Sequence, residues 1–204
     1  MPTRCCYYDT TDLKDAALFE YGISIIPWQA RIQKTLRYYF DRDKRLCLGA
    51  GLLLHHMLLE NGITDMVVDV DENGKPYLLN NSKIHFNISH DGDIAAVALS
   101  DHAVGVDVCS DRVYDKEVAA FSFSGEEIEC VMNSSEPDLE YTRIWAKKES
   151  YLKMTGTGLL EDPKNVTVTG MDNLTEHRIP GYLIVVCTSE PDGISFEEWR
   201  LKKV

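Results

Sequence analysis

Asp107 and Glu149 are the residues whose surroundings best suit chemistry. Asp107 lies in the apolar run 104–109, which predicts a strand, and an unpaired carboxylate buried there is too costly. Glu149 lies four residues after Trp145 and four before Lys153, so a helix places these three side chains on one face. Two carboxylates from separate elements, completed by water and phosphate oxygens, are how proteins usually hold Mg²⁺.

Each of these features also has an ordinary explanation. Asp107 is equally well read as a strand-end residue bonded to a turn. Glu149 and Lys153 have the spacing of a routine surface ion pair, worth a few tenths of a kcal/mol. Ser89 and His90 end a predicted strand, where hydroxyl, imidazole and backbone N–H can meet phosphate, or where the chain simply turns.

Basic residues near two turns leave the same choice open. Lys75 follows Asn73-Gly74 and precedes a proline, which indicates a hairpin tip with a solvated or a ligand-binding lysine. Arg45 lies near a predicted helix start with Arg42 and Lys44, where an anion can bind. A solvated basic face is the alternative.

The elements that must position these residues follow from periodicity and turn signals. Residues 1–26 predict an edge strand or two. Helical spacing predicts helices over 28–39, 42–60, 125–132 and from 139 to Gly156. Strands are predicted at 66–70, 76–79, 84–88, 94–99, 104–108, 164–169 and 182–188. We expect 94–99 and 104–108 to pair as a buried hairpin.

The composition excludes several classes. The chain has 204 residues, 44% of them hydrophobic, and a formal net charge of −12. Nucleic-acid binding needs a basic footprint, so we expect no nucleic-acid partner. No apolar run reaches the ~18 residues of a membrane span, and no signal peptide is apparent in the sequence, so we expect a cytoplasmic protein without a membrane partner. The six cysteines form no CxxC pair, which predicts reduced thiols.

Four motifs occur in an order and spacing that together are specific. The chain resembles the 4′-phosphopantetheinyl transferases, of the larger type that activates carrier-protein domains of peptide, polyketide and fatty-acid synthases. The residues that carry the resemblance are Gly74-Lys75-Pro76, Phe86-Asn87-Ile88-Ser89-His90, Gly105-Val106-Asp107 and Trp145-x-x-Lys148-Glu149-Ser150-x-x-Lys153.

The resemblance implies an α/β (α+β) fold of two similar lobes related by a pseudo-two-fold. The predicted lobes are residues 1–100 and 101–204. The cleft between them would bind coenzyme A and Mg²⁺, with the metal-binding residues in the second lobe. The similar layout of the two halves of the sequence agrees with this expectation.

The resemblance also assigns a reaction and roles. The phosphopantetheine arm of coenzyme A would pass to a serine of an acyl or peptidyl carrier protein, releasing adenosine 3′,5′-bisphosphate. The implied metal ligands are Asp107 and Glu149, with Glu149 also the general base. Lys153 would stabilise the pyrophosphate in the transition state. The implied coenzyme A contacts are Ser89, His90, Lys75 and Arg45, the last two toward the adenosine 3′-phosphate.

Two positions depart from the family. The family commonly has a glutamate, as a third metal ligand, where this chain has Cys109, and a neutral thiol is a poor Mg²⁺ ligand. Water filling the gap, a nearby acid such as Asp111 substituting, or a degraded site are the possible outcomes; we favour the first. The alternative function is therefore an impaired module that binds coenzyme A or a carrier protein. Asp91 stands where the family often has serine.

The remaining expectations concern partners. The resemblance implies a monomer serving fatty-acid or secondary-metabolite biosynthesis. Carrier proteins are usually acidic, so an acidic enzyme needs a local basic or apolar docking patch. Candidates for an apolar patch, which can equally be core residues, are Val113, Tyr114, Phe121 and Phe123.

Overall fold

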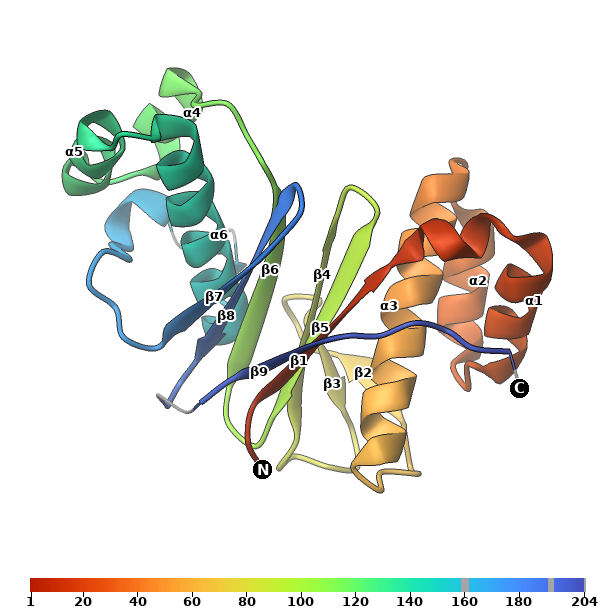
Figure 1. Ribbon diagram of the computed structural model, residues 1–204. Helices are drawn as coiled ribbons and strands as arrows, with labels where there is room; N and C mark the ends of the chain where they lie inside the picture. Colours follow the sequence, from red (N-terminus) through yellow and green to blue (C-terminus); the bar gives the residue numbers. More distant parts are fainter. Residues whose placement is uncertain (159–161, 191–192, 204) are drawn as a thin grey trace.

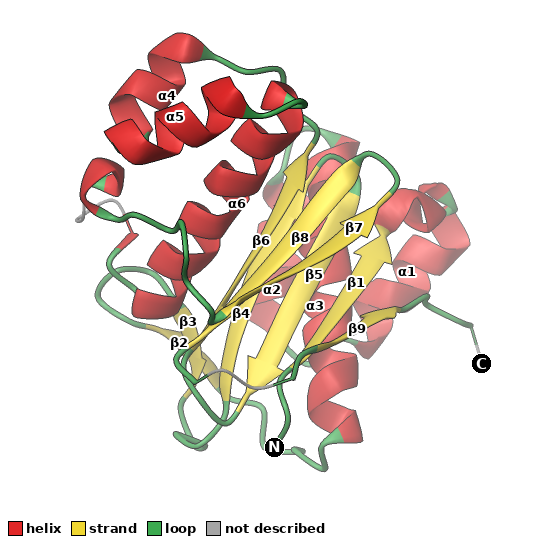
Figure 2. Cartoon of the chain, turned by 60° about the vertical axis from the view of Figure 1, so that its left-hand side comes forward, coloured by secondary structure: helices red, strands yellow, loops and turns green. Residues whose placement is uncertain are grey.

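Two β-sheets pack between two groups of helices in a computed structural model, which describes residues 1–158, 162–190 and 193–203 (Figure 1). Helices α1–α3 lie on one side of the strands and α4–α6 on the other, which a second view confirms (Figure 2). This α/β architecture confirms the fold class predicted from the sequence and is compatible with two lobes.

The first sheet has the strand order β4-β5-β1-β9. Its strands are β1 (Arg4–Asp9), β4 (His85–Asp91), β5 (Ile94–Ser100) and β9 (Ser195–Glu198). β5 pairs antiparallel with both β4 and β1, whereas β9 pairs parallel with β1. A strand from the far end of the sequence therefore completes the sheet that the first residues begin.

Three helices cover one face of this sheet. They are α1 (Ala16–Ile25), α2 (Gln29–Arg37) and α3 (Asp41–Glu60), and a 3-10 turn, η1 (Thr10–Lys14), joins β1 to α1. The centre of α3 is buried on every side, from Leu46 to Leu54. Its leucines pack with Tyr8, Val97 and Leu99 into the largest apolar cluster.

The second sheet has the order β6-β8-β7. Its strands are β6 (Val104–Ser110), β8 (Tyr182–Thr188) and β7 (Leu174–Ile179). The helices against it are α4 (Lys116–Ser122), α5 (Gly125–Asn133) and α6 (Pro137–Thr155), with a 3-10 turn, η3 (Pro163–Asn165). The predicted capping box opens α5: the Ser124 hydroxyl accepts from the Glu127 N–H, and the Glu127 carboxylate accepts from the Ser124 N–H.

Alternation along the strands explains how the two sheets meet. Successive strand residues point to opposite faces. Cys5, Ala96 and Ala98 of the first sheet therefore pack against Val104 and Val106 of the second. The opposite faces of the same strands carry the contacts to helices. One part of the seam between the lobes is thus an apolar contact of two sheets.

Three expectations about strands were wrong. β5 and β6 do not form a hairpin, because β6 pairs with β8 and the chain crosses from one sheet to the other after Ser100. Both strands are buried on both faces, so a sequence pattern cannot choose their partners. β1 is an inner strand, and the later part of 1–26 forms the helix α1 rather than a second strand. The strand predicted at 164–169 is absent, because residues 164 and 165 lie in η3 and 166–169 follow it.

A small hairpin of β2 (Val68–Val70) and β3 (Pro76–Leu78) projects from the first lobe, as the turn at Gly74 predicts. Gly74 has a φ of +81°, which glycine adopts readily. Among the described helices, none is long and apolar enough to cross a membrane.

Candidate active site

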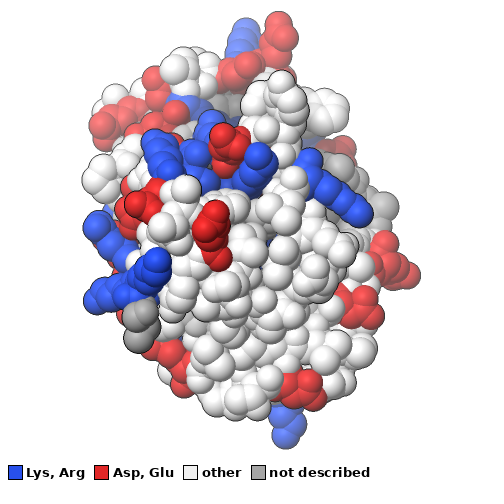
Figure 3. Space-filling view, turned by 90° about the vertical axis from the view of Figure 1, so that its right-hand side faces the viewer, with Lys and Arg blue, Asp and Glu red and all other residues white. Residues whose placement is uncertain are grey.

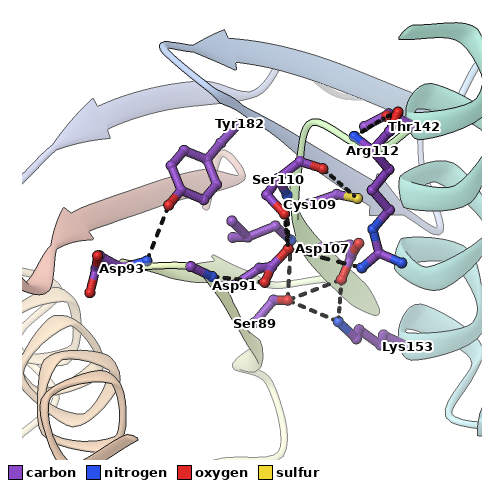
Figure 4. Close-up of polar contacts among 12 residues, drawn as sticks. Ser89, Asp91, Asp93, Asp107, Cys109, Ser110, Arg112, Thr142, Lys153 and Tyr182 are labelled. Carbon is purple, nitrogen blue, oxygen red and sulfur yellow. Dashed lines mark hydrogen bonds and ion pairs between the residues drawn. The ribbon is translucent and has the colours of Figure 1, made fainter. Parts of the chain in front are cut away.

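Asp107, Ser89 and Lys153 meet where β6, β4 and α6 converge (Figure 4). The Lys153 ammonium donates to Asp107 Oδ1 at 2.6 Å and to Ser89 Oγ at 2.9 Å. The Ser89 hydroxyl donates to the same Oδ1 at 3.0 Å. Asp107 is only 6% exposed. Burial raises the pKa of its carboxyl, and Lys153 and Ser89 oppose that rise.

Gly105 lets α6 approach β6 closely enough to form this cluster. A Cβ at residue 105 would lie 2.0 Å from the Ser150 carbonyl oxygen and 2.4 Å from the Met154 nitrogen. Since both are backbone atoms of α6, no side-chain adjustment could make room. Gly105 and Asp107 are two residues apart on β6 and therefore lie on the same face. The strand thus places the acidic side chain directly after the point of closest contact with α6.

Glu149 faces the same cluster from α6. Its carboxylate is partly buried and accepts no hydrogen bond from any residue that the structure describes. Burial and then the neighbouring Asp107 carboxylate raise the pKa of Glu149, while Lys153 and Arg112 lower it. Two like charges held close together without donors for one of them are stabilised by a cation.

These carboxylates are the candidate ligands for a magnesium ion. Within the described ranges, no three His, Cys, Asp or Glu side chains form a metal-binding group, so a metal held by Asp107 and Glu149 would need its other ligands from outside this set. Mg²⁺ is usually held by one or two carboxylates together with water and phosphate oxygens. Every hydrogen bond that Asp107 accepts in the described part of the chain goes to Oδ1. Its Oδ2 is therefore not committed to another donor.

Cys109 and the acids near it do not restore a third ligand. Burial raises the pKa of the Cys109 thiol to about 12, so it stays neutral at neutral pH. Asp111 accepts from Arg178 at 2.6 Å. Asp91 accepts from the backbone N–H and the hydroxyl of Ser110, each at 2.8 Å.

Side chains of β4 continue the hydrogen bonding across the seam. The free edge of β6 donates three backbone N–H groups to alternate residues of β4, each nineteen positions earlier in the chain. These bonds run from Val106 to Asn87 at 2.9 Å, from Val108 to Ser89 at 3.1 Å and from Ser110 to Asp91 at 2.8 Å. We call this set the seam ladder. It fixes the register of the lobes on both sides of Asp107.

Lys75 lies at the C-terminal end of α6. Its ammonium donates to the carbonyl oxygens of Lys153 at 2.6 Å and Met154 at 3.1 Å, where the helix dipole favours a cation. Burial lowers the pKa of Lys75. A cavity of about 470 Å³ adjoins it, lined by residues of both lobes that include Asn87, Lys153 and Gly156.

His90 and Arg45 lie apart from that cavity. Crowding by protein atoms, followed by the charges of Lys153 and Lys34, lowers the pKa of His90, although its imidazole stays exposed to solvent. The imidazole is therefore neutral near pH 7 and adjoins two ammonium groups. Arg45 donates to Asp93 at 3.2 Å and lines a different cavity, against α1. The structure thus brings Asp107, Glu149, Lys153 and Ser89 together, but does not bring Arg45 beside Lys75.

Lys148 has a structural role beside the site. It is 3% exposed, and its ammonium lies 2.7 Å from the Glu127 carboxylate, which is fully buried. Lys148 also donates to the carbonyl oxygens of Pro163 and Val166. This buried pair attaches α6 to α5 and to the segment around η3.

Sequence reasoning missed the seam ladder, Arg112 and the partner of Lys148. The polar residues 87, 89 and 91 alternate along β4, and this period-two signal could have indicated a polar strand face. Arg112 has no such signal, because its place depends on how β6 meets α6.

The comparisons with known proteins agree with this geometry. Residues 103–193 match the family model of the 4′-phosphopantetheinyl transferase superfamily, and residues 16–102 match that of the 4′-phosphopantetheinyl transferase N-terminal region. Together the two models span most of the chain. The chain belongs to the 4′-phosphopantetheinyl transferase superfamily, a class of transferase enzymes.

Individual relatives carry the same family name. The 4′-phosphopantetheinyl transferase psf-1 of Bacillus pumilus is 26% identical, over 76% of each chain. The 4′-phosphopantetheinyl transferase Sfp of Bacillus subtilis (strain 168) is 25% identical, over 81% of this chain and 86% of its own. The L-aminoadipate-semialdehyde dehydrogenase-phosphopantetheinyl transferase of Saccharomyces cerevisiae is 31% identical, over 74% of this chain and 60% of its own.

Proposed function

We propose that this protein transfers the 4′-phosphopantetheine arm of coenzyme A to a serine of an acyl or peptidyl carrier protein. The observation that carries the proposal is the seam cluster of two acids and a lysine. The Asp107 charge on β6 raises the pKa of Glu149 on α6, and Lys153 Nζ lies 2.6 Å from Asp107 Oδ1. Phosphoryl transfer needs fixed groups that position a pyrophosphate and neutralise the charge that develops on it.

The reaction requires one proton transfer and one exchange of P–O bonds. The serine hydroxyl oxygen forms a bond to the phosphorus that carries the pantetheine arm. The bond from that phosphorus to the bridging oxygen breaks, and adenosine 3′,5′-bisphosphate leaves with the electron pair. Glu149 receives the serine proton, directly or through water, since its carboxylate is held without other donors.

Lys153 binds the pyrophosphate oxygens. In the free protein its ammonium is occupied by Asp107 and Ser89. When bound by Asp107 and Glu149, Mg²⁺ supplies charge neutralisation at the pyrophosphate. Ser89 and neutral His90 donate to phosphate oxygens, and Lys75 serves the adenosine 3′-phosphate end. Arg45 was expected to share that role, but it pairs with Asp93 against a different cavity, so we do not assign it there.

The division into lobes at residue 100 suits this proposal. The first lobe, 1–100, contributes Ser89, His90 and the hairpin with Lys75, and the second, 101–204, contributes both carboxylates. β9 lies in the first sheet although it belongs to the second half of the sequence. We propose that substrate binds across the seam, so that neither lobe alone has a complete site.

A docking surface for the carrier protein is supported at the second lobe. Val113 is 79% exposed and Phe121 75% exposed, so both can contact a partner. Phe123 is buried, and Tyr114 packs on the cluster between α5 and α6, so these two are core residues. The opposite side of the molecule, over α1–α3 of the first lobe, differs: there Lys and Arg gather toward one end, beside a broad region without charges (Figure 3).

The test is intact-mass spectrometry of an apo carrier protein incubated with this protein, coenzyme A and Mg²⁺. We expect a mass gain of one phosphopantetheine, and we expect Asp107→Ala and Glu149→Ala each to abolish it. Lys147→Met is a matched control on the same helix, because Lys147 pairs with Glu176 on the outside of α6. No gain across several carrier proteins, with Mn²⁺ also tried, would refute transfer and favour the impaired binding module.

A further inference from the structure

Arg112 is held in place by contacts on three sides. Its backbone N–H donates to Thr142 Oγ1 of α6 at 3.1 Å. Its guanidinium carbon lies 5.0 Å from the centre of the Trp145 ring, a cation–π contact. Its Nη2 lies 3.9 Å from Asp91 Oδ2, the carboxylate at the end of the seam ladder (Figure 4).

The guanidinium nevertheless keeps its hydrogen-bonding capacity. Within the described part of the chain it donates to no oxygen closer than the 3.9 Å approach to Asp91. Asp91 is already satisfied by the Ser110 and Gly92 donors. By contrast, the nearby Arg178 donates to Asp111 at 2.6 Å. Within the described part of the chain, the guanidinium has a side-chain hydrogen bond with the Cys109 thiol, and sulfur is a weak acceptor. Its remaining N–H groups, held in a fixed fork, are suited to a planar or tetrahedral oxyanion.

Arg112 and the cavity beside Lys75 lie at opposite ends of the site. Arg112 stacks on Trp145, and Lys153 lies two helical turns later on α6, about 12 Å along the axis. Glu149 is midway between them. A ligand whose adenosine end occupies the cavity beside Lys75 would extend its pyrophosphate past Lys153 and Glu149 toward Arg112.

The charge at this corner also points to an anion. Arg112 adjoins Cys109, the position where a third carboxylate is replaced by a neutral thiol. An acid at residue 109 would pair with the guanidinium and satisfy it. Without that acid, a fixed positive charge faces the site with 39% of its side chain exposed.

We propose that Arg112 binds the phosphate of coenzyme A that carries the pantetheine arm, and that Asp91 and Trp145 position it. This inference rests on the proposed function. Of the two phosphates in the pyrophosphate, Arg112 would bind only the one that is transferred with the pantetheine arm. Adenosine 3′,5′-bisphosphate lacks that phosphate, so it cannot use Arg112.

Calorimetric titration of the full-length protein with these two ligands tests the proposal, in EDTA and in Mg²⁺. Arg112→Gln should raise the Kd for coenzyme A by about tenfold or more, because a charge-assisted hydrogen bond is lost. It should change the Kd for adenosine 3′,5′-bisphosphate less than twofold. Arg112→Lys, which keeps the charge but not the fork, should give an intermediate loss. Arg178→Gln removes an equal charge beside the site and should change neither Kd.

Equal weakening of both ligands by Arg112→Gln, or no weakening of either, would overturn the assignment while leaving the transferase proposal intact. If Arg112→Gln does not fold, Asp91→Asn provides the second variant, with a smaller loss confined to coenzyme A. An effect of Asp91→Asn on both ligands alike would count against the proposal. Wild-type protein that binds no coenzyme A and modifies no carrier would overturn both proposals together.

Discussion

The charged carboxylate of Glu149 lowers the stability of the ligand-free protein, because it is partly buried beside Asp107. Its pKa in the folded state is raised above the ordinary value by burial and by Asp107. When the pKa of a group is higher in the folded than in the unfolded state, the protonated group stabilises the fold. That contribution is complete below the pKa of the unfolded state, and it is lost as pH rises through the pKa of the folded state. The charged form at pH 8 therefore costs stability.

Glu149→Gln should melt at a higher temperature than wild type at pH 8 in EDTA, because it removes that charge. Each kcal/mol corresponds to ~2–4 °C for a chain of this size. Thermal denaturation followed by circular dichroism measures the difference, which should shrink toward pH 4. Added Mg²⁺ should raise the melting temperature of wild type more than that of the variant. An equal response of the two proteins to Mg²⁺ would count against Glu149 as a ligand.

The pH dependence of transfer should reflect the same group. A general base must be deprotonated, so kcat/KM should fall as pH drops through the raised pKa of Glu149, above the ordinary value of 4.5. Because protons and Mg²⁺ compete for the carboxylates, the acid limb should move to lower pH as Mg²⁺ is increased. Arg112→Gln should move it to higher pH, since Arg112 lowers that pKa. If the acid limb does not move with the Mg²⁺ concentration, it reports the ionisation of a group other than Glu149.

At the scale of elements, the buried pair of Lys148 and Glu127 anchors the helix that carries the site. Lys148→Met leaves the buried Glu127 carboxylate without its cation, although the Ser124 and Val168 N–H groups still donate to it. Removing one partner of a buried ion pair costs about 3–5 kcal/mol. A fall in urea-unfolding free energy of that size is expected. Glu127→Gln combined with Lys148→Met should recover part of it.

Lys147→Met is the matched control for that measurement. Lys147 precedes Lys148 on α6 and pairs with Glu176 near the surface, so its loss should cost at most about 1 kcal/mol. Comparable losses at residues 147 and 148 would show that the Lys148 pair is not the anchor.

Periodicity and local signals predicted most of the elements, but missed α1, α4, β7 and β9 and did not predict strand partners. As predicted, α6 ends at Gly156, which has a φ of +75°. The predicted capping box at Ser124 is also present. Asp107 and Cys109 share a strand face, as the period of two requires. Pairing of β6 with β8, however, depends on contacts between residues some 80 positions apart, which a local pattern cannot specify.

The same distinction applies to the site. Motif order pointed to Asp107, Glu149, Lys153 and Ser89, and these residues converge. The seam ladder and the place of Arg112 depend on how two sheets dock. The position of Lys75 at the end of α6 likewise follows from contact between lobes, so a hairpin tip in the sequence gave no indication of it.

At the scale of the whole molecule, β9 and the residues after it join the second half of the sequence to the first sheet. Trp199 packs edge-on against Tyr8, with ring centres 5.2 Å apart, and Leu201 is 8% exposed in the cluster around α3. A chain ending at residue 194 should therefore show a lower melting temperature and, by size-exclusion chromatography, self-association through the uncovered β1 edge. A chain ending at Lys202 is the control. Unchanged melting after the longer deletion would show that β9 is dispensable.

The parallel pairing of β9 with β1 also bears on biosynthesis. The ribosome synthesises β9 about 190 residues after β1. Throughout that interval the edge of β1 that β9 later covers is unpaired. An unpaired strand edge can pair with other nascent chains. Folding during translation can assemble α1–α3 on their sheet, but that sheet cannot close until residues 195–198 have been synthesised. Translational pausing or a premature stop would thus expose the nascent chain to aggregation at its N-terminal lobe.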